Sequence, residues 1–151
     1  MMMFLQYISS FLATVGFSIL FNIPKKAIVK ASFVGAIGWM AFIYSNQYFH
    51  SLVAASSIGA CIVAIISEIF ARIFKETVTV FIIPGIIPLV PGAGMYYTML
   101  AVIEKDFNRF ASIGSETIFV AGGIAAAILI ISSITRMIFK AKTQLFKKKK
   151  H

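Results

Sequence analysis

The residues whose types and spacing suggest chemistry lie in the stretch 77–103, TVTVFIIPGIIPLVPGAGMYYTMLAVI, which has no charged side chain. Three prolines and three glycines interrupt its middle: Pro84, Gly85, Pro88, Pro91, Gly92 and Gly94. Each proline lacks an N–H group, and its ring clashes with the carbonyl four residues earlier, so a regular helix cannot continue unbroken. We therefore expect two half-helices that meet near residues 85–94, the second starting near 93–95. A single kinked helix is the alternative.

A broken helix of this composition could bind an anion. Inside a bilayer, freed backbone groups find no water, so broken helices are tolerated only where protein buries them or where they line a wet cavity. Secondary transporters hold substrates at such breaks. The N–H groups at the start of the second half-helix favour a carboxylate, and Tyr97 and Thr98, which follow, can donate hydrogen bonds. We predict that these two residues and the six prolines and glycines bind substrate.

Glu68 is the only acidic residue that we expect inside a membrane span, where a charged group is costly and often functional. Arg72 follows four residues later, so one interpretation is an ordinary interfacial ion pair. The other is a carboxylate that couples transport to an ion or holds a substrate amine. The single cysteine, Cys61, allows no disulfide or cysteine-based metal site within the chain. Because no hydrolase, kinase or nucleotide-binding motif is present, we expect no enzyme activity, metal or cofactor.

The elements that position these residues are expected to be membrane helices. The chain is 60% hydrophobic and only 13% charged, whereas a soluble domain is about 25% charged. A membrane helix needs ~20 mostly apolar residues. Five stretches satisfy this requirement: 3–23, 31–49, 52–71, 78–103 and 117–135. We predict an all-α polytopic membrane protein with five transmembrane helices, the fourth broken by the proline- and glycine-rich segment.

The basic residues predict the orientation of these spans. If all five cross the membrane, twelve of the fourteen Lys and Arg residues share one side, and only Lys105 and Arg109 lie on the other. With four spans the split would be even. The positive-inside rule favours the first arrangement, with the N-terminus outside and the C-terminus inside. The net charge of +9 is then explained by orientation and not by nucleic-acid binding. We expect one transmembrane domain over residues 1–140 and a basic cytoplasmic tail over 141–151 that contacts anionic lipid.

The odd number of spans predicts partner helices. Two five-span units joined in tandem would have opposite orientations, which is the inverted repeat common in transporters. One such unit is too small to enclose a substrate path easily. Small residues that permit close helix contact recur in pairs: Gly35 and Gly38, Ala55 and Gly59, Ser56 and Ala60, Gly122 and Ala126, Gly123 and Ala127. They either pack the five spans together or contact a partner.

Several segments together resemble the threonine/serine exporter family. They are VGF at 15–17, FNIP at 21–24, SEIFAR at 67–72, IPGIIPLVPG at 83–92 and YYTM at 96–99. The resemblance is to the short, separately encoded subunit that corresponds to the C-terminal half of the fused exporters, and it extends to about residue 140. It implies export of threonine and serine, or of small dicarboxylates such as succinate. It also implies a larger partner subunit with a soluble cytoplasmic region, and transport driven by an ion gradient.

The leading hypothesis is therefore a cell-membrane subunit of a secondary exporter for small carboxylate-bearing metabolites. Its expected partners are the larger exporter subunit, a small-molecule substrate and the lipid bilayer, without nucleic acid. Two alternatives remain: a non-catalytic scaffold or regulatory subunit of that transporter, and a homo-oligomeric channel. Discriminating threonine from succinate would require a site for the ammonium group, and Glu68 is the only candidate that the expected spans contain.

Overall fold

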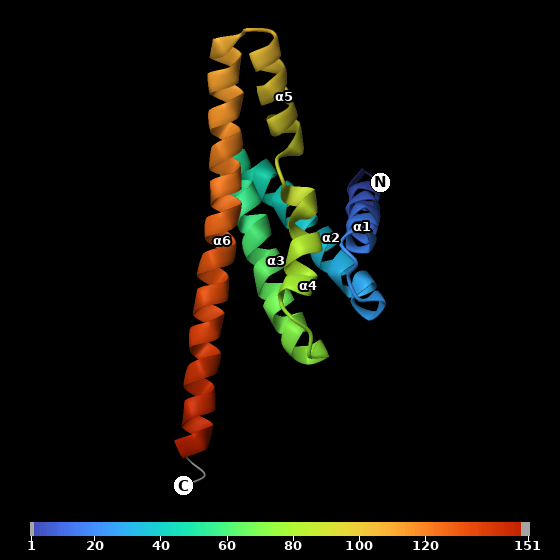
Figure 1. Cartoon of the computed structure of the whole chain (residues 1–151), viewed down its shortest axis with the longest axis vertical. Coiled ribbons are helices and arrows are strands. Elements are labelled where there is room, and N and C mark those ends of the chain that lie inside the picture. The colour runs from blue at the N-terminus through green and yellow to red at the C-terminus, as the bar shows by residue number, and fades with distance from the viewer. Residues whose placement is uncertain (1, 149–151) are drawn as a thin grey trace.

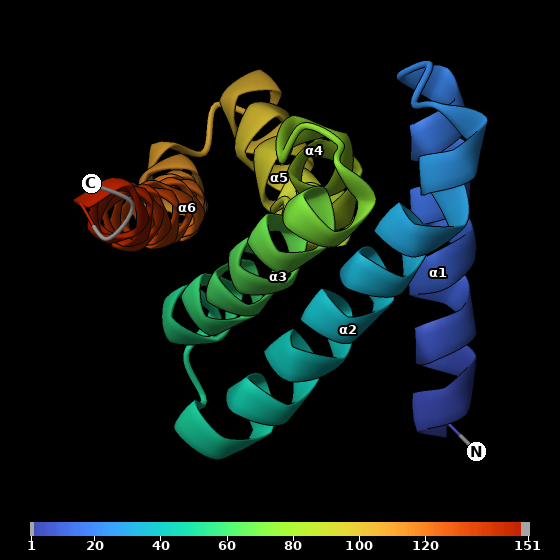
Figure 2. The same ribbon diagram turned by 90° about the horizontal axis from the view of Figure 1, so that it is seen from below.

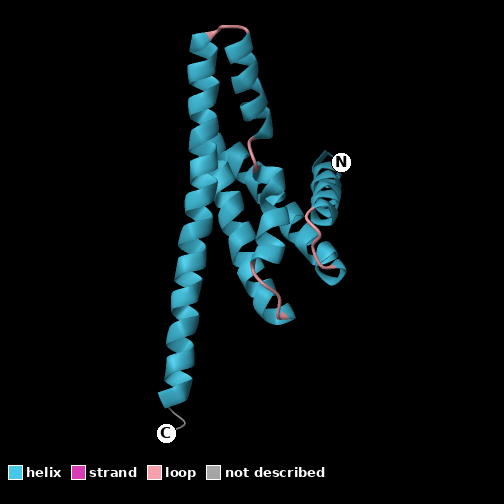
Figure 3. Cartoon of the chain, viewed as in Figure 1, coloured by secondary structure: helices cyan, strands magenta, loops and turns pink. Residues whose placement is uncertain are grey.

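The computed structural model describes the backbone of residues 2–148 and the side chains of residues 3–139, and this part of the chain contains helices without strands (Figures 1 and 3). The elements are α1 (Met2–Leu20), α2 (Lys25–Phe49), α3 (Leu52–Phe74), α4 (Thr79–Ile86), the 3-10 helix η1 (Ile87–Leu89), α5 (Gly92–Ile103) and α6 (Phe107–Lys148). Among these residues, four helices are individually long and apolar enough to cross a membrane. The bent pair formed by α4–η1 and α5 supplies a fifth if it is counted as one span. The predicted all-α polytopic membrane fold is confirmed.

Four long helices form a row, and the broken span covers one face of this row. Seen from below, α1, α2, α3 and α6 lie side by side in chain order, and α4 packs over α2 and α3 (Figure 2). The hairpin made by α5 and the first part of α6 projects beyond the other helices (Figure 1). Within the described part of the chain, α5 packs against α6 alone. One half of the broken span is therefore held inside the bundle, and the other half is held by a single helix.

Small residues bring the central helices together. Gly38 of α2 and Gly59 of α3 face each other so closely that a Cβ built on Gly59 would lie 3.0 Å from the carbonyl oxygen of Gly38. Ala60 of α3 is likewise buried. Gly122 and Ala126 of α6 are instead exposed. The small residues were predicted either to pack the spans together or to contact a partner. Those of α2 and α3 pack the spans together, whereas Gly122 and Ala126 of α6 are not covered by other helices of the described chain.

The predicted break is present between α4 and α5. α4 ends at Ile86, η1 carries the chain through Pro88, and α5 starts at Gly92, one residue before the expected range. Val90 and Pro91 have non-helical ψ angles of 130° and 59°. The axes differ by 53°, so the chain bends but keeps its general direction, and α5 continues beyond α4 (Figure 1). This geometry favours two half-helices of one broken span over a single kinked helix.

The last helix differs from its predicted span. We expected residues 104–116 to connect two spans, but α6 already begins at Phe107. Asp106 supports this early start, because its carboxylate accepts a hydrogen bond from the N–H of Arg109 at 3.0 Å. Hydropathy marks the apolar part of a helix, so the more polar first turns were missed. Consequently, Glu116 lies inside a helix that can span the membrane, and Glu68 is not the only such acid.

The C-terminal end of α6 also runs past the predicted span, to Lys148. The expected basic tail, 141–151, therefore begins within this helix. Its side chains and residues 149–151 lie outside the described part of the structure.

Replacing Gly38 with alanine should destabilise the protein although alanine is the better helix former. A Cβ at this position would collide with the buried side chain of Val63, whose branched Cβ restricts its rotamers. We expect a loss of about 1–3 kcal/mol, typical of overpacking, measured by thermal unfolding in detergent. Gly16→Ala is the matched control, since a Cβ on this glycine of α1 meets no atom within 4 Å. A Gly38→Ala protein as stable as Gly16→Ala would contradict the packing argument.

Candidate functional site

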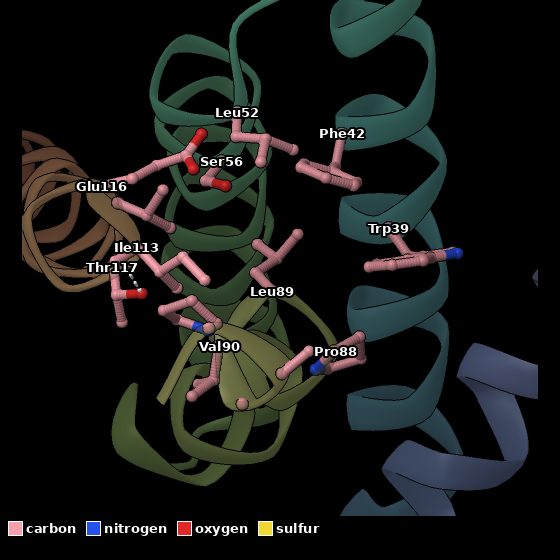
Figure 4. A pocket seen from close by; sticks show the side chains of 15 residues that line it. Trp39, Phe42, Leu52, Ser56, Pro88, Leu89, Val90, Ile113, Glu116 and Thr117 are labelled. Carbon is pink, nitrogen blue, oxygen red and sulfur yellow. Dashed lines mark hydrogen bonds between the residues drawn. The ribbon is translucent and has the colours of Figure 1, made fainter. Parts of the chain in front are cut away.

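A cavity of about 270 Å³ opens at the break in the fourth span (Figure 4). We call it the break cavity. It is bounded by the break itself, residues 88–94, and by side chains of α2, α3 and α6: Trp39, Phe42, Leu52, Ser56, Ile113, Glu116, Thr117 and Val120. Its volume is slightly below the ~300–1,000 Å³ range of sites for drug-sized ligands. A small metabolite is thus the kind of ligand that its size suits.

Two aromatic rings of α2 form one wall of the break cavity. Trp39 and Phe42 stack with their centroids 5.0 Å apart. Trp39 and Pro88 also line a second cavity of about 350 Å³ on the side of α1, together with the polar residues Gln6 and Ser9. These two side chains therefore border both cavities, and movement of either one would change the separation between them.

The start of α5 presents unpaired backbone donors to the break cavity. The N–H of Gly92 donates to the Val90 carbonyl at 2.7 Å, and that of Met95 donates to the Pro91 carbonyl at 3.0 Å. The N–H groups of Ala93 and Gly94 have no partner among the described residues, and both residues line the cavity. Because a helix N-terminus carries a partial positive charge, this end of the cavity can accept an anion.

The wall formed by α3 and α6 carries two polar side chains, Ser56 and Glu116. Figure 4 shows the Glu116 carboxylate turned toward the first turns of α3, on the side where Ser56 lies. Ser56 is only 2% exposed. Neither side chain has a hydrogen-bond or ion-pair partner among the residues that the structure describes. No lysine or arginine is among the described residues that line the cavity.

Sequence reasoning missed Glu116 because it assigned this residue to a connection between spans. The signal available in the sequence was charge isolation. Glu116 is the only charged residue between Arg109 and Arg136. That spacing of about 40 Å along a helix exceeds the ~30 Å hydrocarbon thickness.

The structure gathers four of the eight predicted substrate-binding residues at the break cavity: Pro88, Pro91, Gly92 and Gly94. Pro84 and Gly85 instead lie buried in α4, where a Cβ on Gly85 would touch Val63 and Val34 at 3.1 and 3.2 Å. They fix the first half-helix to α2 and α3, and do not line the cavity.

Tyr97 and Thr98 also lie away from the break cavity. The Thr98 hydroxyl donates to the Gly94 carbonyl at 2.7 Å, and Thr98 lines a separate apolar hollow between α5 and α6. The Tyr97 ring is exposed and packs edge-on against Tyr96. Substrate contact by these two residues stays a prediction.

Glu68 is far from the break and is paired. Its carboxylate lies 2.9 Å from the Arg72 guanidinium, and its side chain is 5% exposed. The same guanidinium stacks over the Phe139 ring of α6 at 3.5 Å. Glu68 follows Ser56 on α3 at a distance of about 18 Å along the helix axis. This geometry favours the ion-pair interpretation, in which the pair links α3 to α6, and the ion-coupling role stays a hypothesis.

Replacing Glu68 with glutamine should lower stability by about 1–3 kcal/mol, because it leaves the Arg72 charge without its buried partner. Thermal unfolding in detergent measures this loss. Glu104→Gln is the matched control: Glu104 pairs with Arg109 at the same 2.9 Å, but both side chains are over 40% exposed, and such surface pairs contribute about 0–1 kcal/mol. Equal stability of the two variants would argue against a structural role for the Glu68 pair.

The chain matches known proteins over most of its length. The family described as "Threonine/Serine exporter, ThrE" matches residues 6–134. A curated protein of Haemophilus influenzae (strain ATCC 51907 / DSM 11121 / KW20 / Rd), described as an uncharacterized protein, is 23% identical over 118 residues. That alignment covers 73% of this chain and 40% of the relative, so the chain spans about two fifths of the relative's length. No solved structure matches the chain.

Proposed function

Because the chain belongs to the threonine/serine exporter family, whose members are multi-pass membrane transporters, we propose that it is one subunit of a secondary exporter that carries threonine and serine. Small dicarboxylates such as succinate are the alternative substrates. The substrate binds in the break cavity, and a larger subunit completes the transport path.

The unpaired N–H groups of Ala93 and Gly94 are the observation that carries this proposal. They open onto a cavity of suitable size at a break in an apolar helix. A substrate carboxylate there would satisfy donors that would otherwise be costly to leave unpaired in a bilayer. Discontinuous helices that point their N-termini at a substrate carboxylate are a recurring feature of secondary transporters. The four residues of the break that line the cavity would then contact substrate through their backbone.

The projecting α5–α6 hairpin supports the proposed partner subunit. α5 packs only against α6 within the described chain, and its other faces expose large apolar side chains, including Tyr96, Met99 and Ile103. The greater length of the Haemophilus influenzae relative is compatible with an additional part of the transporter. Rocking of this unit against the partner, about the Trp39–Pro88 boundary between the two cavities, would provide alternating access.

Export should require both subunits. Cells without their own exporters would express this chain, the larger subunit, or both, and would be loaded with threonine-containing dipeptides or with succinate. We expect export only when both are present, because neither subunit alone encloses the path. Full export by the larger subunit alone would make this chain an accessory, and export by this chain alone would favour a homo-oligomeric channel.

Replacing Gly92 with leucine should abolish export while leaving membrane insertion intact. A Cβ at Gly92 meets no atom within 4 Å and Gly92 lines the break cavity, so the larger side chain would occupy the space assigned to substrate. We expect at least a tenfold lower export rate, as for other losses of substrate positioning. Pro88→Ala, which restores an N–H group at the break, should act in the same direction.

Gly16→Leu on α1 is the control, because a Cβ at this glycine also meets open space but lies outside the cavity. Immunoblots of the membrane fraction would show whether all variants insert equally. Normal export by a well-inserted Gly92→Leu protein would place the substrate site elsewhere.

A further inference from the structure

Glu116 places a negative charge in a cavity where the described chain offers it no counter-charge. Its carboxylate has no ion pair or hydrogen bond with any described residue. By contrast, Glu68 is paired with Arg72 and Glu104 with Arg109. Glu116 is exposed, so its carboxylate needs no partner within the chain and is open to a ligand that enters the break cavity.

Thr117 fixes the position of Glu116 relative to the start of α5. A Cβ built on Gly94 would collide with the Thr117 hydroxyl, so α5 begins in direct contact with this residue of α6. The same hydroxyl donates to the Ile113 carbonyl at 2.7 Å, which holds it in place (Figure 4). Glu116 is the neighbour of Thr117 in the chain. One cavity therefore presents free N–H groups and a free carboxylate from two elements in contact.

Ser56 adds a third polar group to this arrangement. It is 2% exposed, lines the break cavity and makes no hydrogen bond with other described residues. Its small side chain also fits against the surrounding helices, but packing alone would be satisfied by alanine. The Ser56 hydroxyl oxygen is not among the fully buried unpaired hydroxyls of the described chain, which are those of Ser18 and Ser67, so it opens onto the cavity. There it can accept a hydrogen bond from a cationic donor.

We propose that Glu116, assisted by Ser56, binds the ammonium group of an amino acid whose carboxylate lies at Ala93 and Gly94. This proposal rests on the assignment of substrate to the break cavity and specifies how that site selects its substrate. A zwitterion satisfies both the N–H groups and the carboxylate. A dicarboxylate satisfies the N–H groups but brings a second negative charge toward Glu116, and no lysine or arginine among the described lining residues offsets it. Glu116 is thus a specificity-determining residue.

Threonine exchange in proteoliposomes tests this assignment without an ion gradient. Liposomes would contain this chain with the larger subunit, loaded with unlabelled threonine, and take up labelled threonine from outside. Competitors would be threonine, its analogue with a hydroxyl in place of the ammonium, and succinate. With the wild-type protein, we expect the analogue and succinate to compete about tenfold to a hundredfold more weakly than threonine, as expected when a charge-assisted hydrogen bond is lost.

In Glu116→Gln, the KM for threonine exchange should rise about tenfold to a hundredfold, and the preference for the ammonium group should nearly vanish. Glu116→Asp keeps the charge and should retain most of that preference, which guards against a glutamine variant that fails to fold. Ser56→Ala should raise the KM for threonine by a smaller factor and leave competition by the hydroxyl analogue unchanged. Glu104→Gln is the control, because this acid is exposed and lies outside the cavity.

Exchange with a wild-type KM and an unchanged ammonium preference in Glu116→Gln would overturn the proposal. If that variant lost only gradient-driven export, Glu116 would be an ion-coupling residue and the ammonium assignment would be wrong. Gly92→Leu in the same liposomes separates this failure from that of the proposed function. Normal exchange by Gly92→Leu would show that substrate does not bind in the break cavity, and the proposed function would fail. Impaired exchange by Gly92→Leu, together with an unchanged ammonium preference in Glu116→Gln, would reject only the ammonium site.

Discussion

The rest of the structure depends on the backbone groups that three prolines leave unpaired in an apolar segment. In water such groups would be solvated at little cost, but the hydrocarbon core of a bilayer contains no hydrogen-bond partner for them. In this structure one side of the break is buried inside the helix bundle. Pro84 and Gly85 are buried against α2 and α3, so the helix ends in a protected place, and the non-helical angles fall on Val90 and Pro91. The cavity at this point follows from the same constraint, since the prolines prevent the backbone from closing it.

Small residues make this burial possible. Gly38 and Gly59 allow α2 and α3 to approach so closely that α4 can cover both helices. Leu89, at the end of η1, reaches Gly59 as well, which fixes the break against α3. Helix contact and site position are therefore coupled: separating α2 from α3 would move the first half-helix and with it one wall of the cavity. The packing core thus also positions the proposed substrate site.

The second half-helix is held differently. Among the described residues, α5 packs against α6 alone, and Gly94 contacts Thr117 where the two helices meet. Through this contact the partial positive charge of the α5 N-terminus and the negative charge of Glu116 line the same cavity, and Ser56 lines it from α3. Opposite charges on separate elements suit a ligand with two charged ends. The weak attachment of α5 to the bundle is also what a moving or partner-bound element requires, because few internal contacts oppose its displacement.

Much of this protein was predictable from local sequence properties. The apolar stretches predicted the helices, and Pro88, Pro91 and Gly92 predicted the break within a residue of its start, because loss of an N–H group acts on the chain regardless of tertiary contacts. Residues 104–116 were predicted to connect two spans, but α6 begins at Phe107, because hydropathy does not register a polar helix start capped by Asp106. The site needed the tertiary structure. The packing of α6 against α3 and α5 carries Glu116 to the break, whereas Glu68, Tyr97 and Thr98 do not line the cavity. Sequence determines where a backbone must break, whereas the partners that meet at that break depend on contacts between distant segments.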